Sequence, residues 1–263
     1  MGLGKRLRIA LHLLIVGTTL SKLHAVSYVV SCLSTVMWFL VIFVPVTLFS
    51  PNPIAAFKTF LPGVLAMGAA SVGMWVATEF TRWYVYQGLT DLFRECGLGV
   101  LHYLFCSIHI DLLLANTATF FASALAVSWA LTGSPTLAIP SNPWLLALAV
   151  ASSIPTYLLC GSLTALLYCK TGASGTWTNV LQILVTVGTV VPPTALPKPE
   201  LAFVNPAAIV AEIARAAYGA PSIPLSELLP LTPIAIATQL ALALYVSKLV
   251  DEEIARHGLE FRV

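Results

Sequence analysis

The chain alternates between long apolar runs and short polar connections. A transmembrane helix needs about 20 apolar residues to cross a hydrocarbon layer of ~30 Å, and the chain holds six such runs. They extend from Val26 to Phe49, Phe60 to Thr78, Asp111 to Leu131, Trp144 to Tyr168, Thr176 to Val191 and Leu229 to Leu249. The pattern therefore predicts an all-α, polytopic membrane protein with six transmembrane helices.

Composition agrees with this prediction and indicates a single domain. Hydrophobic residues make up 58% of the chain and charged residues 9%, against about 25% charged residues in soluble domains. No charged linker or low-complexity tract divides the chain. We therefore expect one membrane domain over residues 1–263, with an interfacial helix at 1–24, a six-span core at 25–250 and a cytoplasmic tail at 251–263.

The basic residues predict the orientation of the six spans. With the N-terminus inside, three of the 13 basic residues lie outside, namely Lys58, Lys198 and Arg215, and the others lie in the cytoplasm. This bias follows the positive-inside rule and places both termini in the cytoplasm, for a protein of the plasma membrane. The chain has no dense basic patch, so we expect no nucleic-acid partner.

The first residues form a basic and apolar stretch from Leu3 to Leu23. Arg8 and Lys22 within it favour a helix that lies in the inner headgroup layer, with its basic face toward anionic lipid. A cleavable signal peptide with a small residue near Ala25 is the alternative.

The connection between the second and third spans is predicted to lie inside the cell. Its segment from Gly88 to Glu95 is typical of a short amphipathic helix at the inner membrane face, capped by Thr90 or Asp91, because a short oxygen side chain accepts bonds from free N–H groups. The alternative is a solvated loop that only joins two spans.

The connection between the fifth and sixth spans is predicted to lie outside, yet it is largely apolar. Its first prolines end the fifth span because proline lacks an amide donor. Asn205 and Pro206 then suit an N-cap and the first position of a helix from Ala207 to Tyr218. Within it, Glu212 and Arg215 are spaced to pair on one face. We expect a re-entrant or surface-lying helix, the alternative being an ordinary extracellular amphipathic helix.

Chemically useful side chains are few. The five cysteines and five histidines show neither a disulfide framework nor zinc spacing, so we expect no metal and no catalytic residue. Polar residues within the spans, among them Asp111, Asn116 and Gln239, are candidates to line a pathway, although hydrogen bonds between helices are the simpler role.

Three features resemble one known family. They are the basic N-terminal helix, the stretch Gly88-Leu89-Thr90-Asp91-Leu92, and Asn205-Pro206 followed by Glu212 and Arg215. Together they resemble the membrane subunit of type 2 ATP-binding-cassette (ABC) exporters. In that family the first inner loop meets the ATPase, and an Asn-Pro stretch with a downstream Glu and Arg follows the fifth span.

The resemblance implies a permease that depends on other subunits. The chain has no G-x-x-x-x-G-K-[ST] phosphate loop, so the family likeness assigns ATP and Mg²⁺ to a separate ATPase subunit and implies a second permease copy, identical or paralogous. The expected ATPase-coupling residues are Gly88, Thr90, Asp91, Arg94 and Glu95. The chain itself is then a transport subunit without enzymatic activity or a bound cofactor.

Two other functions remain open. Gly172-Ala173-Ser174-Gly175 resembles the G-x-S-G of rhomboid-type intramembrane serine proteases, but such a serine needs a neighbouring base, and the run from Leu229 to Leu249 contains no histidine. A membrane scaffold that transports nothing is the second alternative.

Overall fold

The computed structural model describes residues 25–79, 95, 97–105, 107–172 and 174–257, and within this part of the chain it is helical without any strand. The all-α prediction is confirmed for these residues. The predicted interfacial helix at 1–24 and the segment Gly88 to Arg94 lie outside the described residues. The elements are α2 (Ala25–Leu48), α3 (Pro53–Glu79), α5 (Val100–Leu104), α6 (Ser107–Thr132), η2 (Pro135–Ala138), α7 (Pro143–Thr171), α8 (Ser174–Val190), η3 (Pro193–Ala195), η4 (Pro199–Val204), α9 (Ala208–Ala217) and α10 (Leu225–His257).

Each of the six predicted spans falls on one of the long helices. Among the residues that the structure describes, three stretches are long and apolar enough to cross a membrane by length and composition, namely Pro53–Thr78, Pro143–Thr171 and Leu225–Arg256. They lie on α3, α7 and α10. The remaining predicted spans correspond to α2, α6 and α8, and their passage through a membrane stays a prediction.

Local chemistry explains where several helices begin and end. The Asn142 side chain accepts hydrogen bonds from the amides of Trp144 (3.1 Å) and Leu145 (3.2 Å) and so caps α7. That helix ends at Gly172, whose φ of +72° lies in the left-handed region favoured by glycine. Helix α8 ends at Val190, just before the predicted proline stop.

Helix α10 is longer than the last predicted span. It begins at Leu225 and continues to His257, so residues 251–257 of the predicted cytoplasmic tail continue the same helix. Pro230 and Pro233 lie inside this helix near its start. The short helix α5, which follows the first connection, was not predicted.

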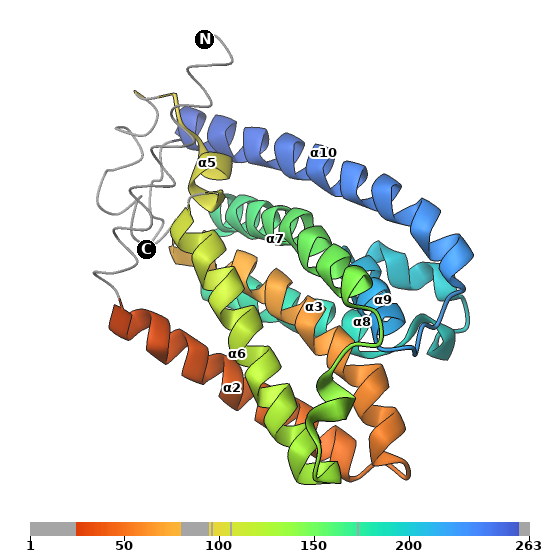
Figure 1. Cartoon of the computed structure of the whole chain (residues 1–263). Helices are drawn as coiled ribbons and strands as arrows, with labels where there is room; N and C mark the ends of the chain where they lie inside the picture. The colour runs from red at the N-terminus through yellow and green to blue at the C-terminus, as the bar shows by residue number, and fades with distance from the viewer. Residues whose placement is uncertain (1–24, 80–94, 96, 106, 173, 258–263) are drawn as a thin grey trace.

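Helix α3 forms the centre of the bundle, with residues in each of three buried apolar clusters. It crosses α7 closely because Gly73 and Gly161 lack side chains at the contact: a Cβ on Gly73 would lie 2.3 Å from the Tyr157 carbonyl oxygen. Figure 1 shows α10 and α2 at opposite sides of the bundle, with α9 and α5 at opposite ends.

The outer helices carry apolar side chains on their exposed surfaces. Large apolar residues of α2, α8 and α10 are exposed, such as Met37, Ile183 and Ile234. Soluble monomers rarely expose such extended apolar surfaces. These surfaces therefore suit contact with lipid or with another membrane helix.

Candidate functional site

Helix α9 lies inside the fold, between the ends of the long helices. It packs against α3, α7, α8 and α10, and each of its residues from Ala208 to Ala217 is buried. Five of these ten residues are alanine, and small side chains let neighbouring helices approach closely. An amphipathic helix lying on the surface would expose one face to water, whereas every residue of α9 is buried.

The entry to α9 is fixed to α8 by Asn205. Its Oδ1 accepts a hydrogen bond from the Ala207 amide (3.0 Å), and its Nδ2 donates to the Val185 carbonyl (3.0 Å). Gly188 makes room for this contact, since a Cβ there would lie 2.3 Å from the Asn205 amide nitrogen. The N-cap of α9 is Ala207 rather than the predicted Asn205. Asn205 instead holds the turn before the helix and joins it to α8.

The exit from α9 follows the predicted pattern. Gly219 has a φ of +73°, and the Ala220 amide donates to the Arg215 carbonyl at 3.0 Å. Such a glycine stop satisfies carbonyls at a helix end that have no intrahelical donor. The Tyr218 hydroxyl donates to the Ala138 carbonyl (3.0 Å) and fastens this exit to η2.

Gln239, a candidate pathway residue, bridges three helical segments. Its Nε2 donates to the Pro206 carbonyl (2.6 Å) at the start of α9, and its Oε1 accepts from the Thr156 hydroxyl of α7 (2.9 Å). Gln239 is buried on α10. The structure therefore gives it the simpler role of a hydrogen-bonding bridge between helices.

Glu212 and Arg215 form the predicted ion pair, and both side chains are almost fully buried. Arg215 Nη1 donates to Glu212 Oε1. The other carboxylate oxygen, Oε2, accepts a hydrogen bond from the Ser222 amide (3.0 Å). A buried charge is tolerated when it is paired and its remaining hydrogen-bonding capacity is filled, and both carboxylate oxygens meet this condition.

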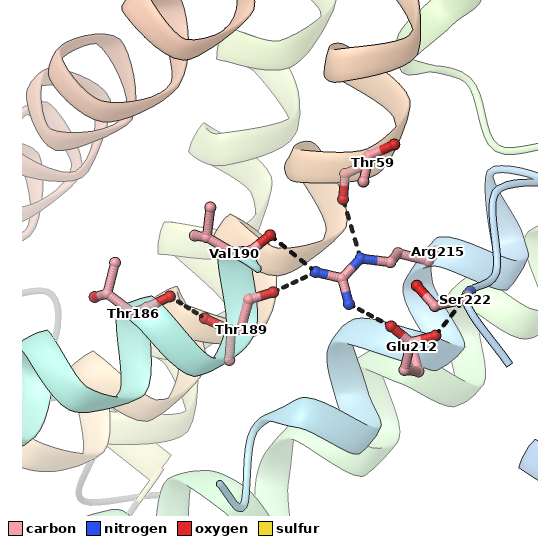
Figure 2. Close-up of polar contacts among 7 residues, drawn as sticks. All are labelled: Thr59, Thr186, Thr189, Val190, Glu212, Arg215 and Ser222. Atoms are coloured by element: carbon pink, nitrogen blue, oxygen red, sulfur yellow. Dashed lines mark hydrogen bonds and ion pairs between the residues drawn. The ribbon is translucent and has the colours of Figure 1, made fainter. Parts of the chain in front are cut away.

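Arg215 also binds main-chain carbonyls of two other helices, as Figure 2 shows. Its Nε donates to the Thr59 carbonyl of α3 (3.0 Å), and its Nη2 donates to the carbonyls of Thr189 and of Val190 (3.2 Å) at the end of α8. In a continuing helix the Thr189 carbonyl would accept from residue 193, which is a proline without an amide hydrogen. Arg215 supplies the missing donor.

Opposing effects act on the Arg215 guanidinium. Burial lowers the pKa of the Arg215 guanidinium, and attraction to the Glu212 carboxylate raises it in part. Arginine is not deprotonated in proteins, so the side chain stays charged. We name the set Thr59, Thr189, Val190, Glu212, Arg215 and Ser222 the Arg215 cluster. It joins α3, α8, α9 and the segment before α10.

The structure describes few of the other candidate residues in full. Gly88, Thr90, Asp91 and Arg94 of the expected coupling loop lie outside the described residues, and Glu95 is exposed. Asp111 and Asn116 fall on α6, but their side chains are not among those described. Their roles stay predictions.

No other reactive centre is found in the described part of the chain. Its His, Cys, Asp and Glu side chains form no group that would hold a metal ion. Ser174 is the first residue of α8, and His257 is the last residue of α10.

Comparison with known protein families, curated proteins and solved structures found no match. What the chain does must therefore be inferred from its own residues.

Asn205 provides a first test of this site. We expect Asn205→Ala to lower the free energy of unfolding by about 1–2 kcal/mol, the scale of two lost hydrogen bonds, because it removes the bonds to Ala207 and Val185. Asn52→Ala is the matched control, since the Asn52 Oδ1 accepts from the Ala55 amide (3.1 Å) at the exposed start of α3, within the same helix. Reversible unfolding in mixed micelles measures both, and equal losses would contradict a bridging role for Asn205.

Proposed function

We propose that this protein is the membrane-spanning permease subunit of an ABC transporter of the type 2 exporter class. In this proposal a separate ATPase subunit hydrolyses ATP, and the movement it produces drives substrate through a pathway formed with a second permease copy. One observation carries the proposal: the connection between α8 and α10 folds back into the bundle and buries the Glu212–Arg215 pair. The family resemblance expects a Glu and an Arg after the fifth span.

Six spans are the arrangement that this proposal requires. Helices α2 (24 residues), α6 (26 residues) and α8 (17 residues) join the three helices that already meet the length and composition required. At 1.5 Å per residue, even α8 is about 26 Å long, close to the ~30 Å hydrocarbon thickness. The exposed apolar side chains of α2 and α8 suit the bilayer or the second permease copy.

The charges suggest which end of the bundle faces the cytoplasm. Lys170, Lys248 and Arg256 are exposed at the end that holds α5, whereas Arg215 at the α9 end is buried and paired. Lys58 and Lys198 are the other described basic residues at the α9 end. The positive-inside rule then puts the α5 end in the cytoplasm, and α9 becomes a re-entrant helix at the outer face.

A re-entrant α9 is physically reasonable in this setting. Irregular backbone is tolerated at membrane depth only where protein covers it and fills its hydrogen bonds. The segment around α9 satisfies this requirement through Asn205, Gln239 and Arg215, which together bind carbonyls on α3, α8 and the entry to α9. The helix therefore closes the outer end of the bundle without leaving a charge in contact with lipid.

Membrane orientation is tested by labelling single cysteines in a background without the native ones. We expect Lys198→Cys to react with a membrane-impermeant maleimide in intact cells, and Lys170→Cys to react only after permeabilisation. Both lysines are exposed, so burial does not hide either site. Reaction of both positions from the same side would contradict the proposed threading.

The transport role itself is tested with an ATPase subunit encoded next to this chain. We expect the two proteins to copurify with two permease copies per complex, and ATP hydrolysis to rise when the permease is present. Binding without any change in the hydrolysis rate would favour a scaffold. A chain that stays monomeric and recruits no ATPase would overturn the proposal.

A further inference from the structure

Helix α5 lies at the end of the connection between α3 and α6 and packs into the bundle. It spans only Val100–Leu104, yet both terminal residues are fully buried. It packs against α3, α7 and α10, and the Tyr157 hydroxyl of α7 donates to its Leu104 carbonyl at 2.8 Å. Figure 1 shows α5 beside the last turns of α10. The segment that leaves the loop is thus held by helices distant in sequence.

Asp251 of α10 holds the first turn of α5. Its Oδ1 accepts a hydrogen bond from the Val100 amide at 3.0 Å. The preceding residue is glycine, and a Cβ there would displace the carboxylate, because it would lie 2.1 Å from Asp251 Oδ2 and 2.7 Å from its Cγ. The amide at a helix start has no intrahelical acceptor, so this carboxylate satisfies a donor that α5 cannot satisfy itself.

The surroundings of Asp251 show that this contact belongs to the interior face of α10. On the exposed face, Glu252 pairs with Lys248 (3.7 Å) and Arg256 (3.4 Å). On the opposite face, Val250 and Ile254 are buried in the same apolar cluster as Val100 and Leu104. Because α10 has 33 residues, it is about 50 Å long and extends beyond a ~30 Å hydrocarbon layer. Asp251 lies in that extension.

We propose that Asp251 is the positioning residue that couples the first inner loop to the last span. The loop, between α3 and α6, is the expected docking place of the ATPase, so this inference rests on the proposed function. A rigid contact at Gly99 and Val100 transmits a displacement of the loop exit to α10 and, through Tyr157, to α7. Without it, the displacement would reach chiefly α3 and α6, the helices that the loop joins covalently.

The contact itself is tested on the full chain in lipid nanodiscs by hydrogen exchange. We expect Asp251→Ala to speed exchange in residues 99–104 by about tenfold, the scale of one hydrogen bond to a charged acceptor, while α3 and α7 keep their protection. Asp251→Asn retains an acceptor oxygen and should exchange close to wild type. Glu252→Ala, which removes a neighbouring carboxylate from the exposed face, is the matched control. Unchanged exchange in Asp251→Ala would overturn the contact.

The coupling is tested in the complex with the ATPase subunit. Spin labels at Tyr245→Cys on α10 and Trp129→Cys on α6, both exposed positions, report the distance between these helices before and after trapping with ATP and vanadate. We expect a nucleotide-dependent change that is at least halved in Asp251→Ala and retained in Asp251→Asn and Glu252→Ala. A stable complex in which Asp251→Ala shows the full change would overturn the coupling role but leave the proposed function intact. Absence of a nucleotide response in the otherwise unmodified, labelled chain would overturn both, and the exchange result would still report the contact.

Discussion

Replacing Arg215 by methionine is expected to lower the free energy of unfolding by about 3–5 kcal/mol, the cost of removing one partner of a buried ion pair. The variant leaves the Glu212 carboxylate buried without its partner, and removes the donors that reach the carbonyls of Thr59 and Thr189. Steric trapping or denaturant unfolding of the full chain in micelles measures the loss. Hydrogen exchange should rise at the end of α8 before it rises in the centre of α3.

Two further variants show whether the loss of stability comes from removing any basic residue or from removing a buried one. Lys248→Met removes an exposed partner of Glu252, and exposed pairs contribute about 0–1 kcal/mol. In the double variant Glu212→Gln/Arg215→Met the buried charge disappears with its partner, so we expect part of the lost stability to return. The carbonyls of Thr59 and Thr189 still lack their donor, and recovery should be incomplete. Similar losses for Arg215→Met and Lys248→Met would contradict a stabilising role for the Arg215 cluster.

The positions of the long helices could be predicted because each apolar run is long and ends in a strong local signal. Proline after Val191 stops α8 within one residue of the predicted end. Gly219 ends the segment of α9 as expected. Such signals act through the backbone of one or two residues, so they are readable without knowing what packs against them.

Two features of the fold were not predicted from the sequence. Helix α10 begins at Leu225, four residues before the predicted span, and continues through Pro230 and Pro233. Membrane helices tolerate such prolines when neighbouring groups satisfy the freed carbonyls. Helix α5 is only five residues long and is held by Asp251 and Tyr157, which are far away in sequence, so no local pattern indicated it.

Only part of the candidate site could be predicted from the sequence. The spacing of Glu212 and Arg215 was enough to predict their pairing, because it depends only on helix geometry. The remaining partners of Arg215 are main-chain carbonyls, which every residue carries, and only Pro193 marked the Thr189 carbonyl as lacking a donor. Complete burial of α9 depends on how α3, α7, α8 and α10 pack around it, which periodicity does not specify.

Close approach of α3 and α7 depends on Gly73, and Gly73→Ala is expected to destabilise the protein by about 1–3 kcal/mol or more, the range for overpacking a filled interior. The added Cβ would lie 2.3 Å from the Tyr157 carbonyl oxygen and 3.0 Å from its carbon. These are backbone atoms and cannot rotate away as a side chain would. Relief requires the two helices to separate, which would also disturb Tyr157 and its bond to Leu104.

Gly68→Ala is the matched control because it places the same methyl group on the same helix. A Cβ at Gly68 meets nothing within 4 Å, and alanine favours helix over glycine by about 0.5–1 kcal/mol. We therefore expect Gly68→Ala to be neutral or slightly stabilising under the same unfolding conditions. Equal behaviour of the two variants would show that α3 and α7 do not approach through Gly73. Suppose that only Gly73→Ala loses stability and that amide hydrogens of α5 also exchange faster in this variant. The crossing of α3 and α7 would then be shown to support the anchoring of α5.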